Sequence, residues 1–145
     1  MSLERWAEKG WLRGHVASRE EIGNLLALIE RDLADSAITG LTPDWRLNIA
    51  YNAALQCATT ALAASGYRAS REAHHVRTIG SLEFTVGADQ VKVAQLDMFR
   101  RKRNVSDYER TGGVSETEAL EMRQFALELR DDLLSWLKAE HPELL

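Results

Sequence analysis

The feature that most constrains the fold is a regular apolar stripe near the C-terminal end of the chain. Apolar residues there step by three and four positions, at Ala119, Met122, Ala126, Leu129, Leu133 and Trp136. This spacing places them on one face of an α-helix that packs in a bundle. Ser115 and Glu118 stand just before the stripe in the order of a capping box, in which each side chain bonds to the other's backbone N–H. The pattern therefore predicts a long bundle helix that begins at Ser115.

Four earlier segments also carry helix signals. Ser18 and Glu21 form another capping-box pattern, and Gly40 is typical of a helix stop. Thr42 and Pro43 are typical of the cap and the first position of a following helix. We therefore expect helices over about residues 18–40, 42–65 and 70–86, and from 88 into the basic cluster that follows.

Five such helices with short connections and no strand signal predict an all-α fold, an antiparallel up-and-down bundle of four to five helices. We expect a single domain over residues 1–145, with an N-terminal extension over 1–17 and the bundle over 18–140. Trp6 and Trp11 in the extension are expected to pack on the bundle or on a partner chain. The segment 42–65 is rich in alanine, which would let neighbouring helices approach it closely.

Charge and composition narrow the functional classes. The formal net charge is −4, so any contact with nucleic acid must come from a local patch. Cys57 is the single cysteine and cannot form an internal disulfide, which favours a cytoplasmic location and a packing role for this thiol. No stretch approaches the roughly 20 apolar residues that a membrane span requires.

The common catalytic and metal-binding motifs are missing from the sequence. It contains no Glu-x-x-His pair of the di-iron bundle type, and Glu72 is followed by His74 and His75 at the wrong spacing. It also contains no G-x-S-x-G elbow and no glycine-rich phosphate loop. We therefore expect no metal and no cofactor.

The densest charge cluster, "FRRKRNVSDYER", spans residues 99–110. On a helix, Arg103 and Asp107 would be neighbours at i, i+4, as would Arg100 and Asn104, and Asn104 and Tyr108. One interpretation is an Arg103–Asp107 ion pair on a solvated face. The other is that Arg100, Arg103 and Asn104 bind a phosphate, while Tyr108 stacks on a base or donates its hydroxyl.

A polar stripe runs along the alanine-rich segment. Asn48, Asn52 and Gln56 recur at i, i+4 and i+8 and share one helix face. This stripe is either solvated surface or the wall of a polar cleft, and Tyr51 is a further candidate for that wall.

Two stretches together resemble the HEPN superfamily of small prokaryotic helical proteins. They are "DWRLNIAYNAALQCATTAL" (44–62) and "RNVSDYE" (103–109). The resemblance implies an all-α bundle that often forms a homodimer, with the two motif arginines approaching one shared cleft. Catalytic members of the superfamily are metal-independent ribonucleases, in which an Arg and a His steady the scissile phosphate and assist 2′-OH attack. Many members pair with a nucleotidyltransferase in toxin–antitoxin modules.

The motif in this chain departs from the catalytic pattern at one position. Arg103 matches the motif arginine and is the candidate catalytic residue, and Asn104 matches the polar residue after it. Tyr108 occupies the histidine position, and no His lies between Arg77 and Glu140.

We therefore expect a non-catalytic or weakly active HEPN-like protein that binds nucleotide or RNA in a dimer cleft. The expected ligand-binding residues are Arg103, Asn104, Tyr108, Arg100, Asp107, Asn48, Tyr51 and Asn52. Two alternatives stay open. One is a bundle that only binds a partner protein, such as a nucleotidyltransferase. The other is a metal-independent ribonuclease toxin that works without the motif histidine.

Overall fold

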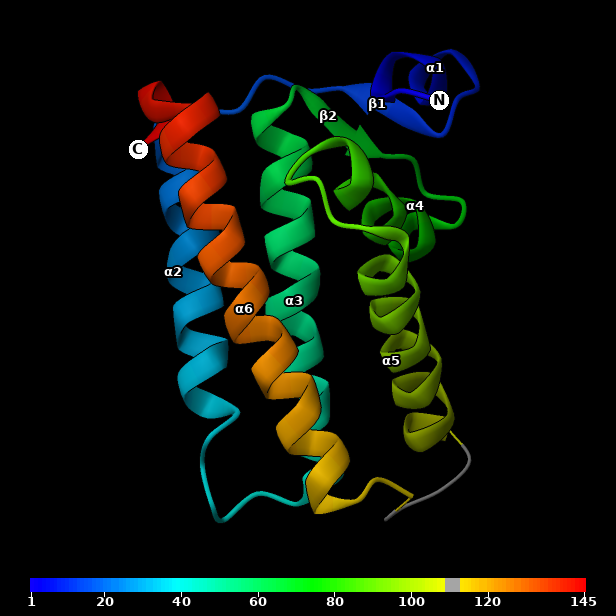
Figure 1. The fold of residues 1–145 in the computed structure, drawn as a ribbon, viewed down its shortest axis with the longest axis vertical. Coiled ribbons are helices and arrows are strands. Elements are labelled where there is room, and N and C mark those ends of the chain that lie inside the picture. Colours follow the sequence, from blue (N-terminus) through cyan, green and yellow to red (C-terminus); the bar gives the residue numbers. More distant parts are fainter. Residues whose placement is uncertain (109–112) are drawn as a thin grey trace.

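The computed structural model describes the backbone of residues 1–108 and 113–145 and the side chains of residues 1–104 and 113–145. Helices dominate this part of the chain, which confirms the predicted all-α bundle (Figure 1). The α-helices are α1 (Leu3–Glu8), α2 (Arg19–Asp35), α3 (Pro43–Ala64), α4 (His74–Gly80), α5 (Gln90–Tyr108) and α6 (Glu116–Glu140). Two short strands, β1 (Leu12–Gly14) and β2 (Tyr67–Ala69), and two 3-10 turns, η1 (Ser81–Phe84) and η2 (Pro142–Leu144), complete the order.

The four long helices alternate in direction. In Figure 1, α2 and α5 run away from the end that carries the two strands, and α3 and α6 run back toward it. Helix α3 lies at the centre, where it packs most extensively on α6 and α2 and also contacts α5 and α4. Helix α3 is therefore covered by several other helices.

The alanine-rich body of α3 explains this central position. Its side chains Ala50, Ala53, Ala54, Ala58 and Ala61 are fully buried. Small side chains let two backbones approach closely, which suits a helix that must be covered on several sides. Cys57 is also fully buried here, and burial raises the pKa of its thiol to about 12, so the predicted packing role is confirmed.

Several helix boundaries agree with the sequence prediction. Helix α6 begins after the complete Ser115–Glu118 capping box, and α3 begins at Pro43. Helix α2 ends at Asp35, before Gly40, because the chain turns at Ser36, whose hydroxyl donates to the Leu33 carbonyl. The predicted stop at Gly40 was therefore wrong by one turn.

The capping box predicted at the start of α2 forms only in part. The Ser18 hydroxyl accepts from the Glu21 N–H as expected. The Glu21 carboxylate instead accepts from His15 Nε2 at 2.7 and 2.8 Å and from Arg68 Nη2 at 3.1 Å. Burial alone would raise the pKa of Glu21, but these two donors outweigh it and lower that pKa below the ordinary 4.5. Glu21 thus ties α2 to the two strands rather than to its own N-terminus.

The helix predicted over 70–86 forms only in part, because α4 begins at His74 and gives way after Gly80 to the 3-10 turn η1, which ends at Phe84. The chain reverses at Gly66, where φ is +96°, and continues as β2, α4 and η1. Strand β2 pairs antiparallel with β1, with Leu12 opposite Ala69 and Gly14 opposite Tyr67. Three-residue strands are too short to show an alternating pattern, which explains why the sequence carries no strand signal.

The N-terminal extension packs on the same chain. The Trp6 ring stands edge-on to Phe84 and to Trp11, with ring centroids 5.2 and 5.5 Å apart. The Arg77 guanidinium lies 3.5 Å from the Trp11 ring centroid, a cation–π contact. These contacts hold α1 and β1 against α4 and η1.

We predict that Ala58→Leu destabilises the fold by about 1–3 kcal/mol, because the larger side chain overpacks a fully buried helix face. Urea unfolding followed by circular dichroism measures the change. The matched control is Ala139→Leu on the exposed surface of α6, which should shift stability by no more than about 0.5 kcal/mol. Equal effects of the two substitutions would contradict the close packing of α3.

Candidate functional site

Arg103 joins the two stretches that carry the sequence motifs. It lies in the second half of α5, and its Nε donates a hydrogen bond of 2.5 Å to Asn48 Oδ1 on α3. Its guanidinium carbon also stands 5.4 Å from the centroid of the Tyr51 ring, within cation–π range. Asn48 and Tyr51 are one helical turn apart, so a single face of α3 positions Arg103.

An open cleft of about 230 Å³ lies next to this contact. Its lining residues come from α2, α3 and α5 and are Asp32, Trp45, Asn48, Ile49, Asn52 and Arg103. The four residues from α3 follow an i, i+3, i+4, i+7 pattern, which places them on one helix face. The Trp45 side chain is 59% exposed at this cleft. The structure thus places Asn48 and Asn52 in a cleft wall, whereas Gln56 is not among the lining residues.

Asp32 supplies a buried carboxylate to the cleft. The residue is 5% exposed, and its Oδ2 accepts from Asn52 Nδ2 at 2.7 Å. Its Oδ1 accepts from Arg31 Nε and Nη2 at 3.1 and 3.0 Å. An ionised carboxylate can only accept hydrogen bonds. The donor end of the Asn52 amide, its NH₂ group, therefore faces Asp32. Among the described residues, no donor reaches the Asn52 Oδ1.

A histidine that is distant in the sequence contacts Tyr51 as well. His75, at the start of α4, shares a hydrogen bond of 3.2 Å between its Nδ1 and the Tyr51 hydroxyl. Tyr51 is 1% exposed, and burial is the main cause that raises the pKa of its hydroxyl to about 12. Burial also lowers the pKa of His75, and the positive charges of Arg103, His74 and Arg100 lower it further. The neutral imidazole is therefore favoured beside two cationic arginines.

The other basic residues of α5 pair within the chain. Arg100 Nε donates to Asp97 Oδ1 at 2.8 Å, and Arg101 Nε lies 3.4 Å from Asp97 Oδ2. Lys102 Nζ lies 3.1 Å from Glu118 Oε2 on α6. Arg100 is not among the residues that line the cleft, whereas Arg103 is.

Three further residues of the predicted site lie on α5. Asn104 is half-buried on α5. Asp107 and Tyr108 belong to α5, but their side chains lie outside the described residues, as does the Arg103–Asp107 pair considered from the sequence.

Sequence reasoning missed Asp32, Trp45 and His75. Trp45 could have been found by extending the Asn48–Asn52 face back by one turn. Asp32 and His75 carried no such signal, because they lie on other helices and reach the site only through tertiary packing.

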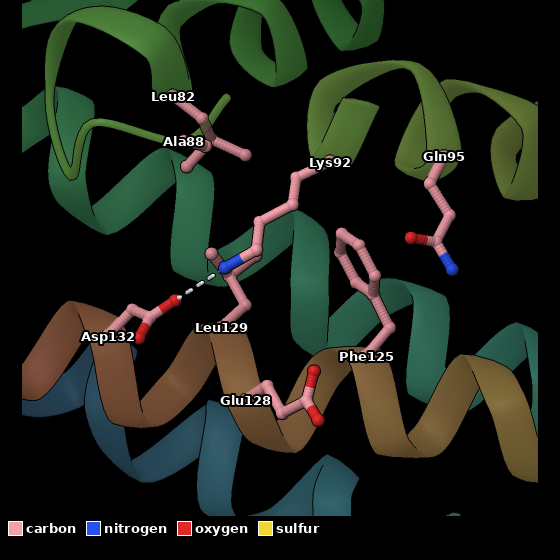
Figure 2. A pocket seen from close by; sticks show the side chains of 8 residues that line it. All are labelled: Leu82, Ala88, Lys92, Gln95, Phe125, Glu128, Leu129 and Asp132. Carbon is pink, nitrogen blue, oxygen red and sulfur yellow. Dashed lines mark hydrogen bonds and ion pairs between the residues drawn. The ribbon is translucent and has the colours of Figure 1, made fainter. Parts of the chain in front are cut away.

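A second cavity, of about 50 Å³, lies between α5 and α6 (Figure 2). The Phe125 ring points from α6 toward α5, and Lys92 reaches across to Asp132 at 3.5 Å. The charged groups that cross this gap thus pair with each other. A space of this size has room for one or two water molecules, so it offers no ligand site comparable to the cleft.

We predict that Arg103→Gln raises the pKa of His75 toward its ordinary value of 6.5, because the substitution removes one of the positive charges that lower it. NMR titration of the histidine rings measures this pKa. The control is Arg13→Gln, which removes an exposed charge in β1 and should leave the His75 pKa unchanged. An unchanged His75 pKa in Arg103→Gln would show that the two side chains are not neighbours.

The described residues show neither a metal centre nor a membrane span. No three His, Cys, Asp or Glu side chains among them gather closely enough to hold a metal ion. None of the helices in this part of the chain is both long and apolar enough to cross a membrane. In comparisons with known proteins, no family model, curated protein or solved structure matches the chain at a significant level.

Proposed function

We propose that the chain is a HEPN-like protein that binds a nucleotide or a short segment of RNA in the cleft between α2, α3 and α5. One observation carries this proposal. Arg103 stands beside an exposed indole, Trp45, in a cleft that is otherwise lined mainly by amides and one carboxylate. A guanidinium suits a phosphate, and an exposed aromatic ring suits an unstacked base. The proposal gives Trp45 the stacking role that the sequence suggested for Tyr108.

The charge distribution favours a short ligand over a long nucleic acid. Arg100 and Arg101 share Asp97, and Lys102 pairs with Glu118, so much of the basic cluster is neutralised within the chain. Long polyanions are bound by many unpaired cations acting together. A single nucleotide, or a few linked ones, fits a cleft of about 230 Å³ better.

The family resemblance supports the same proposal. Its two stretches, 44–62 and 103–109, meet through the hydrogen bond from Arg103 to Asn48. The proposal adds what the resemblance implies, a homodimer whose motif arginines face one cleft, and the cytoplasmic location that the single cysteine favours. It also adds a nucleotidyltransferase-type partner in a toxin–antitoxin module.

We predict that Arg103→Ala weakens binding of a short, mixed-sequence single-stranded RNA by about tenfold or more, the effect of losing a charge-assisted hydrogen bond. Fluorescence anisotropy with end-labelled RNA in chelator measures the affinity. Arg13→Ala removes an equal charge from exposed β1 and is the control. Because Arg103 also bonds to Asn48, Trp45→Ala provides a second test at an exposed side chain.

Two results would contradict this proposal. Equal losses in Arg103→Ala and Arg13→Ala would indicate binding by net charge alone. If Arg103→Ala and Trp45→Ala bind RNA as the unaltered protein does, and Arg103→Ala only lowers the melting temperature, the basic motif is structural. The alternative of a bundle that binds a partner protein would then be favoured.

One observation also favours the ribonuclease as a second candidate. His75 shares a hydrogen bond with Tyr51, and the Arg103 guanidinium carbon lies 5.4 Å from the centroid of the same Tyr51 ring, although the motif itself has no histidine. A neutral imidazole can accept the proton of an RNA 2′-OH as its oxygen attacks the adjacent phosphorus. The bond from phosphorus to the 5′-oxygen of the next nucleotide then breaks, and that oxygen takes a proton from solvent. A 2′,3′-cyclic phosphate and a 5′-hydroxyl result, and Arg103 would stabilise the charge on the phosphate oxygens.

If the chain is a ribonuclease, we predict RNA cleavage in chelator that is lost in His75→Ala and in Arg103→Ala. His74→Ala is the matched control at the exposed neighbouring residue: cleavage should persist, with its pH dependence shifted upward because His74 contributes to the lowered pKa of His75. The rate should rise with pH through the His75 pKa, which lies below 6.5, since only the neutral ring accepts a proton. Gel analysis and end-group mapping detect the products. Cleavage that persists in His75→Ala would rule out this candidate.

A further inference from the structure

The cleft has hydrogen-bond acceptors near α2 and a cation near α5. Asp32 and Asn52 form the acceptor end, and Arg103 forms the cationic end. On the basis of the proposed function, we propose that the cleft selects guanine nucleotides. The phosphate would lie toward Arg103, and the Watson–Crick edge of the base would face Asp32 and Asn52.

The Asp32 carboxylate can accept one more hydrogen bond. An ionised carboxylate has about four lone-pair positions on its two oxygens. Among the described residues, three N–H groups occupy it, two from Arg31 and one from Asn52. Because Asp32 is 5% exposed and little water reaches it, a donor from the ligand would make a strong, charge-assisted bond there.

Asn52 provides the second acceptor beside the first. Its NH₂ group is committed to Asp32 at 2.7 Å, which fixes the orientation of the amide. Its Oδ1 meets no donor among the described residues. The hydrogen bond between the two side chains therefore holds a carboxylate oxygen and an amide oxygen close together.

Guanine is the common base that best matches two adjacent acceptors. Its Watson–Crick edge carries N–H donors on N1 and on the neighbouring N2 amino group. Adenine and cytosine present one amino donor next to a ring-nitrogen acceptor, and uracil presents one N–H between two carbonyl oxygens. Each of these three bases would place an acceptor against an oxygen of Asp32 or Asn52. Two acceptors have no hydrogen between them and cannot form a hydrogen bond.

The apolar side chains of the cleft suit the face of a base. Ile49 lies between Trp45 and Asn52 on the same face of α3 and is half-buried. Trp45, which is 59% exposed, also lines the cleft. A planar base can pack on these side chains while its edge meets the acceptors, as aromatic platforms do in single-strand binding proteins.

Isothermal titration calorimetry with 5′-GMP, 5′-IMP and 5′-AMP tests the selection. We expect 5′-GMP to bind about tenfold or more tighter than 5′-AMP, the discrimination of a bidentate base contact. The nucleotide 5′-IMP, which keeps N1–H and lacks the N2 amino group, should fall between them.

Two variants and one control locate the effect. Asp32→Asn replaces a buried acceptor by a group that is partly a donor, and it should abolish the preference for guanine while binding still requires Arg103. Asn52→Ala removes the second acceptor at a half-buried position and should reduce the preference even if Asp32→Asn does not fold. Gln56→Ala is the matched control, because Gln56 lies one turn further along the same stripe and outside the cleft.

The outcomes separate this inference from the proposed function. Equal binding of 5′-GMP and 5′-AMP, both weakened by Arg103→Ala, would overturn the guanine selection and leave nucleotide binding intact. A guanine preference that survives in both Asp32→Asn and Asn52→Ala would also overturn it. If neither the mononucleotides nor RNA bind, both the inference and the proposed function fail.

Discussion

The structure depends on the burial of α3 along most of its length. Five alanines on this helix are fully buried, and α2, α5 and α6 cover it from different sides. Larger side chains would hold these neighbours further away, because a packed interior has no room to absorb added volume. The small residues of α3 therefore set how closely the other helices approach, including the helix that carries Arg103.

The same helix builds both the core and the cleft. Asn48 accepts a hydrogen bond from α5, and Asn52 donates one to α2, so each amide fastens a neighbouring helix while it lines the cleft. Tyr51, between them in sequence, is buried and connects Arg103 to His75. A polar group that is buried must find a partner, and these partners come from three different helices. The contacts with Asn48 and Tyr51 therefore position Arg103 against α3.

The basic cluster of α5 illustrates what a helix pattern can and cannot predict. Its spacing predicted the neighbours of Arg100 and Arg103 within one helix. In the structure, Arg100 turns back to Asp97, while Arg103 reaches Asn48, which is 55 residues away in the sequence. The packing of α5 on α3 decides which residues of other helices these side chains reach. The same reasoning explains why His75, without any motif around it, came to lie beside Tyr51.

The sequence by itself determined the all-α class, the positions of α3 and α6 and the Ser115–Glu118 cap, because periodicity and capping act within a few residues along one chain segment. It also singled out Arg103 in the basic cluster and placed Asn48 and Asn52 on one polar helix face. Only the tertiary structure decided that β2 pairs with β1, that Glu21 bonds to His15 and Arg68, and that Asp32, Trp45 and His75 gather around these residues. These features join segments far apart in the sequence, and no local pattern encodes which surfaces meet once the helices pack.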